Sequence, residues 1–319
     1  MTACTRPRKV VVTGWLMAVD FPLLKGEKTP CQNITLGGVE VSVLRADLNH
    51  PIIQGNKLWK LKYNLEQARR TACDGLITFG GAYSNHLLAT AQAAQLVGMR
   101  ATGVVRGDEL ANHPEKWSST LKQCRNLGMR LVFVSRSDYR LKVQARPVQG
   151  LLSAGGKHWI IPEGGSNQFA IKGVAEWVQE TAQSMPSPSH LLCPVGTGGT
   201  LAGLIVGVSQ SAWRCQVLGV GVLKGLHGVK HDINQWLTAH EVACEWSVLT
   251  QYHAGGYHKS TPELVGFCQD FKQQHDIQLD KIYNAKSFFA LADMIASGAI
   301  TPQDTPLIIH TGGLQGGVF

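Results

Sequence analysis

The chain has 319 residues, 44% of them hydrophobic and 16% charged, so it can form a large core in two domains and is not generally disordered. Its formal net charge of +8 comes from scattered basic residues. Without a Lys/Arg block, this charge favours a small anionic ligand over a nucleic-acid partner. The eight cysteines form no Cys-x-x-Cys pair, and no apolar run reaches 18 residues. We therefore expect a reduced, cytoplasmic protein with no metal site and no membrane span.

The first residues resemble no core element. Arg6, Arg8 and Lys9 precede an apolar segment at 10–19 that faintly resembles a signal peptide. This segment is short, and no small-x-small cleavage site follows it. We therefore favour an extension outside the core, upstream of a start at Met17.

From about residue 38, short β-branched segments alternate with helical patterns. In chain order we expect a strand at 39–44, a helix at 57–72, a strand at 76–79, a helix at 85–97, a strand at 100–105, a helix at 118–126, a strand at 130–134, an apolar segment at 159–162, a helix at 170–184, a strand at 190–195, a helix at 199–211, and strands at 217–222 and 307–310. Such alternation is typical of an α/β fold with mostly parallel sheets. Ligands bind such folds at the carboxyl ends of the strands, where this chain has pairs of glycines.

The segment from Pro194 to Thr200, Pro-Val-Gly-Thr-Gly-Gly-Thr, joins an expected strand to a helix of small residues. Its backbone N–H groups and the helix N-terminus favour a bound phosphate. A tight turn before a closely packed helix is the alternative. A dinucleotide fingerprint needs a glycine where Leu201 stands, and a Walker loop needs Gly-Lys-Ser/Thr, which is absent.

Two further segments open helices and carry reactive side chains. Lys57 follows Gly-Asn at a helix start, where a cation meets the unfavourable end of the helix dipole. Taken alone, it could be an ordinary surface lysine. Ser84 and Asn85 follow Gly-Gly-Ala-Tyr after an expected strand. Either could simply cap the next helix, or could contact a ligand at the edge of the sheet.

Taken together, these segments resemble the 1-aminocyclopropane-1-carboxylate deaminase and D-cysteine desulfhydrase family. Its members are enzymes that use pyridoxal 5′-phosphate (PLP) and have the fold of the tryptophan synthase β-subunit, called fold type II. The resemblance runs from about Thr29-Pro30 to Gly313. It rests on Gly-Asn-Lys57 with Lys60, Gly-Gly-x-x-Ser84-Asn85-His86, Pro162-x-Gly-Gly-Ser166-Asn167, the 196–200 loop, Gly256-Tyr257, Asp280-x-x-Tyr283-x-x-Lys286 and His310-Thr311-Gly312-Gly313.

The resemblance implies a role for each matched residue. Lys57 would hold PLP as a Schiff base and, once freed, remove the α-proton of the substrate. Ser84 would contact the substrate carboxylate or assist the chemistry, and Tyr257 and Tyr283 would face the substrate. The cofactor would be bound through Asn85 at its ring oxygen, Thr311 at its pyridine nitrogen, and Gly196, Thr197, Gly198, Gly199 and Thr200 at its phosphate.

The resemblance also implies the architecture and the assembly. We expect two three-layer α/β domains, a large PLP-binding domain of residues 1–58 plus 165–319 and a small domain of residues 59–164. The segment Pro162-Glu-Gly-Gly-Ser166 is a plausible hinge between them. The family resemblance further implies a homodimer.

Three positions differ from the family pattern and bear on the reaction. Tyr83 stands where many members have glutamine, Asn284 where deaminases have glutamate, and Thr311 where they have leucine. The last two favour β-elimination and deamination of a small amino acid, as in D-cysteine desulfhydrase, giving a 2-oxo acid and ammonia, with sulfide if D-cysteine is the substrate. The alternatives are 1-aminocyclopropane-1-carboxylate deaminase activity, a PLP-binding protein without turnover, and a nucleotide-dependent dehydrogenase or transferase that shares only glycine turns.

Overall fold

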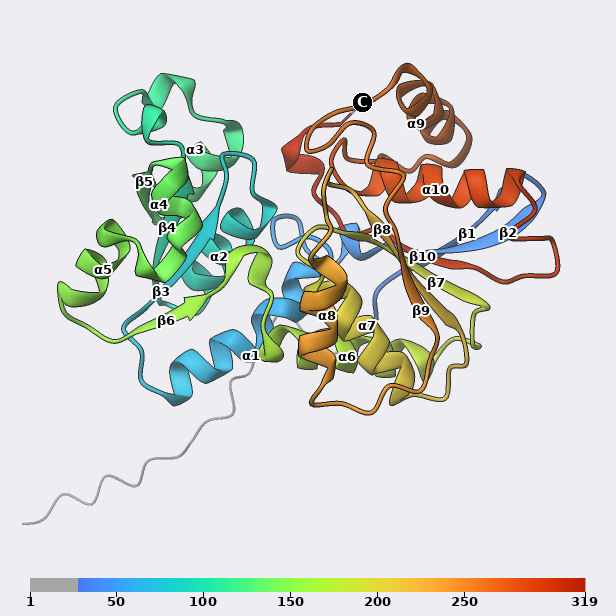
Figure 1. Cartoon of the computed structure of the whole chain (residues 1–319), viewed down its shortest axis with the longest axis horizontal. Coiled ribbons are helices and arrows are strands. Elements are labelled where there is room, and N and C mark those ends of the chain that lie inside the picture. Colours follow the sequence, from blue (N-terminus) through green and yellow to red (C-terminus); the bar gives the residue numbers. More distant parts are fainter. Residues whose placement is uncertain (1–27, 319) are drawn as a thin grey trace, which may run out of the picture.

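Two separate β-sheets form the framework of the protein (Figure 1). The computed structural model describes residues 28–318. The expected segment at 10–19 and the start at Met17 lie outside these residues. The smaller sheet contains four strands, which in spatial order are β5 (Arg130–Val134), β4 (Arg100–Arg106), β3 (Gly75–Gly80) and β6 (His158–Ile161). All of its neighbouring strands are parallel.

The larger sheet contains six strands. In spatial order they are β1 (Cys31–Leu36), β2 (Val39–Leu44), β10 (Leu307–Ile309), β7 (His190–Val195), β8 (Gln216–Gly221) and β9 (Trp246–Leu249). Only the edge pair β1–β2 is antiparallel, joined by a tight turn at Gly37-Gly38, where both glycines have positive φ. The other pairs are parallel.

Helices cover both faces of each sheet. Successive strand residues point to opposite sides, and apolar residues on both sides must be buried. In the small sheet Leu76 packs toward α2 (Asn85–Leu96) and α3 (Ser119–Asn126), whereas Ile77 and Phe79 pack with residues of α4 (Arg136–Leu141) and α5 (Arg146–Ser153). On the large sheet α9 (Pro262–His275) and α10 (Asn284–Ala296) cover one face. The opposite face is covered by α6 (Gln168–Ala182) and α7 (Gly199–Ser209), with α8 (Val229–Leu237) against α7.

The helix α1 (Lys57–Arg70) links the two sheets. It packs on α6, where Trp59 and Trp177 stack with ring centroids 5.7 Å apart. The close approach requires Gly173, since a Cβ there would lie 2.0 Å from the carbonyl oxygen of Trp59. One continuous apolar cluster includes residues of both sheets and of α1, α6 and α7. The small sheet is therefore connected to the large one by apolar contacts through these helices.

The structure confirms the α/β class and the alternation expected from the sequence. Each strand and helix expected there is present, with bounds that differ by at most two residues. The pattern does not predict β1, β9, α4, α5, α8, α9 or α10. The small sheet lies within 59–164 and the large sheet within the rest of the chain. The domain bounds 1–58 plus 165–319 and 59–164 themselves stay a prediction.

Candidate active site

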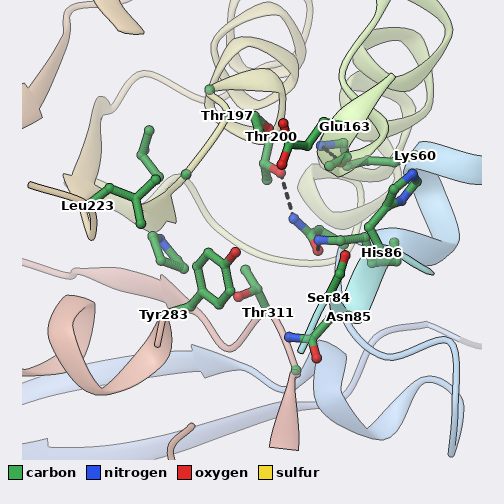
Figure 2. Close-up of a pocket in the computed structure, with 18 of the residues that line it drawn as sticks. Lys60, Ser84, Asn85, His86, Glu163, Thr197, Thr200, Leu223, Tyr283 and Thr311 are labelled. Carbon is green, nitrogen blue, oxygen red and sulfur yellow. Dashed lines mark hydrogen bonds between the residues drawn. The ribbon is translucent and has the colours of Figure 1, made fainter. Parts of the chain in front are cut away.

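A cavity of about 230 Å³ opens between the carboxyl ends of strands from both sheets (Figure 2). The small sheet contributes Arg106 at the end of β4 and the turn between β3 and α2. The large sheet contributes the loop from β7 to α7, Leu223 after β8 and Thr311 after β10. This is the position at which open α/β sheets bind their ligands.

The loop at 196–200 has the geometry of a phosphate site. Gly198 has a φ of +83° and precedes the 11-residue helix α7, whose N-terminus therefore opens into the cavity. A Cβ on Gly199 would lie 2.4 Å from Ser166 Oγ. The missing side chain thus lets the loop pack closely against Ser166, and the helix dipole favours an anion at the N-terminus of α7.

Side chains around this loop form a connected polar network. Asn56 Nδ2 donates to Thr200 Oγ1 at 2.6 Å, so the threonine hydroxyl can itself donate to a ligand (Figure 2). Lys60 Nζ donates to Ser166 Oγ at 3.0 Å and to the Gly164 carbonyl at 2.5 Å, and Ser166 lies 2.6 Å from Thr197 Oγ1. Burial, followed by the nearby Lys57, holds the pKa of Lys60 well below its usual value.

Lys57 is the first residue of α1 and lines the cavity. Its Nζ donates to Asn56 Oδ1 at 2.8 Å. Burial lowers the pKa of Lys57 to about 8, against an opposing effect of the Asp280 carboxylate. An amine with such a pKa has a substantial neutral, nucleophilic fraction near pH 7.

The turn before α2 combines capping with access to the cavity. Ser84 caps α2, because its Oγ accepts from the Leu87 N–H at 3.3 Å, and it also lines the cavity. Asn85 lines the cavity with a buried Oδ1 that has no hydrogen-bond partner. His86 is fixed by Thr78 Oγ1 at 2.8 Å, and burial holds its pKa well below the usual range, so the ring is neutral.

Thr311 is held by a chain of polar residues that leads away from the cavity. Asn284 Oδ1 accepts from the Thr311 N–H at 2.8 Å and from its hydroxyl at 3.2 Å. Asn284 Nδ2 donates in turn to Asp280 Oδ1 at 2.6 Å and to the Gly312 carbonyl at 2.7 Å. Asn284 and Asp280 are fully buried, whereas Thr311 reaches the cavity. The carboxylate charge is therefore separated from the cavity by an amide and a hydroxyl.

Two tyrosines also line the cavity, and Tyr283 lies close to the 196–200 loop, since a Cβ on Gly196 would be 3.3 Å from Tyr283 Cε1. Figure 2 shows Tyr283 beside Thr311, and Tyr257 lines the cavity nearer its mouth, with 39% of its surface exposed. Burial raises the pKa of Tyr257 to about 12 and also raises that of Tyr283. Both hydroxyls are therefore protonated at neutral pH and can donate hydrogen bonds.

Comparison with known proteins identifies the family to which this framework and cavity belong. The family model described as pyridoxal-phosphate dependent enzyme matches residues 23–312. A protein of Pyrococcus abyssi with the provisional name 1-aminocyclopropane-1-carboxylate deaminase is 30% identical over 289 residues, covering 88% of this chain and 86% of the relative. The chain therefore belongs to the family of PLP-dependent enzymes.

A second relative and the solved structures agree with this assignment. D-cysteine desulfhydrase of Serratia proteamaculans is 26% identical over 312 residues, covering 92% of this chain and 94% of the relative. A crystal structure of a homologue of 1-aminocyclopropane-1-carboxylate deaminase has a TM-score of 0.78 and 28% identity, covering 91% of this chain and 90% of that one. An L-serine ammonia-lyase from Rhizomucor miehei, 17% identical with a TM-score of 0.62, shares the fold.

The residues of the cavity fit PLP. The 196–200 loop offers backbone N–H groups and an open helix N-terminus for the phosphate, and Lys57 offers an amine of lowered pKa for the aldehyde carbon. Asn85 Oδ1 is buried without a hydrogen-bond partner, so the amide is available to a ligand. A flip of the side chain exchanges the amide oxygen and nitrogen, so either atom can face that ligand. Chemistry of this kind matches the phosphate, aldehyde and ring substituents of the cofactor.

All of the expected site residues except Gly199 line the same cavity. Gly199 begins α7 directly beside it. The cavity also contains residues to which the sequence assigned no role, namely Asn56, Lys60, His86, Arg106, Glu163 and Leu223. Asn56, Lys60 and His86 stand within the motifs that carry the family resemblance, which was a usable signal. No sequence signal pointed to Arg106 or Glu163. Arg106 is the last residue of β4, and Glu163 follows β6.

No helix among the described residues is long and apolar enough to cross a membrane. Within the same part of the chain, no three His, Cys, Asp or Glu side chains are grouped as metal ligands.

Proposed function

We propose that this chain catalyses β-elimination and deamination of a small β-substituted amino acid such as D-cysteine. The reaction would consume one water, whose oxygen replaces the nitrogen on the α-carbon, and the products would be a 2-oxo acid, ammonia and the protonated departing group. The observation that carries the proposal is the neutral Thr311 hydroxyl, backed by the buried Asn284 amide, in the same cavity as an amine of lowered pKa, Lys57.

Lys57 acts as the base in this proposal. Bound PLP supplies the electron sink that accepts the electron pair released when the α-proton of the amino acid is removed. With a pKa of about 8, the freed Lys57 amine is neutral in roughly one molecule in ten at pH 7, compared with fewer than one in a thousand at its usual pKa. The amine therefore accepts the α-proton at Nζ at physiological pH.

The turn at Ser84 and the two tyrosines position the substrate. The N-terminus of α2 presents the Ser84 hydroxyl and backbone N–H groups to the cavity, which suits the substrate carboxylate. Tyr257 and Tyr283 keep their hydroxyl protons at neutral pH, because burial raises their pKa values, and each can donate a hydrogen bond to a departing β-substituent.

The Thr311–Asn284–Asp280 chain bears on the choice of reaction. A carboxylate at the pyridine nitrogen would stabilise positive charge there by a few kcal/mol more than a hydroxyl does, on the order of 2–3 kcal/mol in a partly dry site. Asp280 lies behind the Asn284 amide, so this stabilisation is weakened. Opening a cyclopropane ring has no good leaving group and needs the stronger sink, whereas elimination of a thiolate needs it less.

Steady-state rates test the proposal. With PLP saturating, amino acids of both hands are screened for release of a 2-oxo acid, and D-cysteine is compared with 1-aminocyclopropane-1-carboxylate. We expect a higher kcat/KM for D-cysteine or another β-substituted amino acid. Comparable or faster ring opening would assign the deaminase activity instead, and cofactor binding without release of any 2-oxo acid would indicate a binding protein.

We also propose the homodimer and the two domains that the resemblance implies. Sedimentation at micromolar concentration tests the dimer, and a monomeric mass would contradict it. Limited proteolysis near 162–166 tests the domain bounds, since a hinge there would be cut before either sheet.

A further inference from the structure

Lys286 is a buried cation to which the proposed reaction assigns no role. It lies on α10, three residues after Tyr283, and its side chain is fully enclosed. Its Nζ donates to the Gly256 carbonyl at 2.7 Å and to the Val222 carbonyl at 2.9 Å. None of the ion pairs between described residues includes it. Its hydrogen-bond partners are therefore backbone carbonyls of two other segments, and the Asp280 carboxylate favours its charge without forming an ion pair.

Those two segments form the substrate side of the cavity. Val222 directly precedes Leu223, and Gly256 directly precedes Tyr257; Leu223 and Tyr257 both line the cavity. Around these positions, 222–228 and 250–261, the backbone belongs to no strand or helix. The Lys286 amine thus fastens two irregular segments to the helix that begins beside Tyr283.

Burying this amine is costly, which argues that its bonds matter. An ammonium group removed from water is unfavourable unless its hydrogen bonds are replaced, and burial lowers the pKa of Lys286 to about 8. A methionine would fill the same space without that cost, but it would leave the two carbonyls without this donor. Packing alone therefore does not explain a lysine here.

We propose that Lys286 is a positioning residue. Its two hydrogen bonds fix the positions of Leu223 and Tyr257 relative to Tyr283 and so shape the substrate side of the cavity. The groups assigned to the cofactor lie elsewhere, on α1, on the turn before α2, on the 196–200 loop and at Thr311. Loss of the amine then impairs substrate binding more than cofactor binding. The role of this wall in binding substrate rests on the proposed function.

Two variants of graded severity test this. Lys286→Gln keeps an amide donor on a shorter side chain, and Lys286→Met keeps the length without a donor. We expect KM for the amino acid to rise about tenfold or more in Lys286→Met and less in Lys286→Gln, with kcat changed less than KM. The Kd for PLP should stay within about twofold, because the cofactor contacts are intact. Lys272→Met, at an exposed lysine of α9, is the matched control and should change neither constant.

Backbone hydrogen exchange gives a readout that needs no turnover. Peptides covering 222–225 and 254–258 should exchange faster in both Lys286 variants than in the wild type, while peptides of β7 and α7 should not. Unchanged exchange in these loops, an equal loss of cofactor and substrate affinity, or failure of both variants to fold would each overturn the positioning role. If the wild type turns over no amino acid, the proposed function fails while the exchange comparison still decides the role of Lys286.

Discussion

Lys57 and Lys60 lie three residues apart on α1, but their amines have different surroundings. Lys60 donates to Ser166 and to the Gly164 carbonyl beside the 196–200 loop, so it already has two hydrogen-bond partners. Lys57 has Asn56 Oδ1 as its hydrogen-bond partner and lines the open cavity. Of the two, Lys57 is the amine that is free to react with a carbonyl carbon.

Replacing Lys57 by alanine should therefore abolish turnover while leaving the fold intact. The variant should also lose the visible absorption band of the covalently attached cofactor and become insensitive to borohydride. Lys62→Ala is the control, because Lys62 lies on the same helix but pairs with Glu176. This variant should keep its turnover, its visible absorption band and its sensitivity to borohydride. Full activity in Lys57→Ala would contradict the assignment of this residue.

The lowered pKa of Lys57 predicts how covalent attachment of PLP depends on pH. Only the neutral amine attacks the aldehyde, and the pKa of about 8 places half of the amine in that form near pH 8. The attachment rate of the apoprotein, followed by rapid-mixing absorbance, should rise with pH through a midpoint near pH 8 and then level off. A rate that keeps rising to a midpoint near the usual lysine pKa of about 10.4 would show that burial does not lower it.

At the scale of the element, the loop from β7 into α7 is the clearest case of a structure set by glycine. Gly198 has a φ of +83°, and a Cβ there would lie 2.9 Å from Ile233 Cγ1. Any side chain at this position costs about 1–2 kcal/mol in backbone conformation alone. An acidic one, whose Cβ would face Val229 and Ile233 of α8, also brings a negative charge close to the loop at which the phosphate is expected.

Comparing Gly198→Ala with Gly198→Asp separates these two effects. Both variants should lower the thermal midpoint because both carry a Cβ. Only Gly198→Asp should prevent retention of PLP during gel filtration, since its carboxylate repels the phosphate dianion. Equal retention in the two variants would show that the loop does not bind the phosphate.

Two of the elements that the sequence does not predict, α10 and β1, lack a clear apolar pattern. In α10 the buried positions include Asn284, Lys286 and Ser287 as well as apolar residues, so polar side chains interrupt the apolar pattern of the inward face. The edge strand β1 buries only Ile34, which leaves little alternation to detect. In α9, Thr261 and Pro262 did give a start signal, an N-cap followed by proline at the first position.

Site residues divide in the same way. Residues within strand-to-helix turns, such as Ser84 and Gly198, could be predicted, because local sequence determines both the turn and the direction in which it opens. The placement of Asn284 behind Thr311 could not, because the two are 27 positions apart and meet only through tertiary packing. The hydrogen bonds of Lys286 to the Val222 and Gly256 carbonyls could not be predicted either, because they join residues that are far apart in the sequence.

At the scale of the whole molecule, the cavity lies between the two sheets, and residues that follow strands of both sheets line it. Ser84 and Asn85 belong to the small sheet's turn, whereas Thr200 and Thr311 follow strands of the large sheet. A ligand that contacts all four residues connects the two parts of the molecule. Binding of PLP should therefore stabilise the protein as a unit, in addition to completing the site.

Thermal unfolding measures this connection. Apoprotein prepared with hydroxylamine should melt at a lower temperature than protein with PLP at a hundredfold excess over its Kd, because ligand binding to the folded state contributes about 2.7 kcal/mol, or roughly 4 °C for a chain of this size. Inorganic phosphate, tested at the same multiple of its own Kd, serves as a probe that contacts only the 196–200 loop. By mass action alone it would raise the midpoint equally at that ratio, so the comparison that matters is the number of unfolding transitions.

The apoprotein and the phosphate-bound protein should show a broader or two-step transition, because neither has a ligand that contacts both sheets. The PLP-bound protein should unfold in one sharper step, and an unchanged transition width across all three samples would contradict the connecting role of the cofactor.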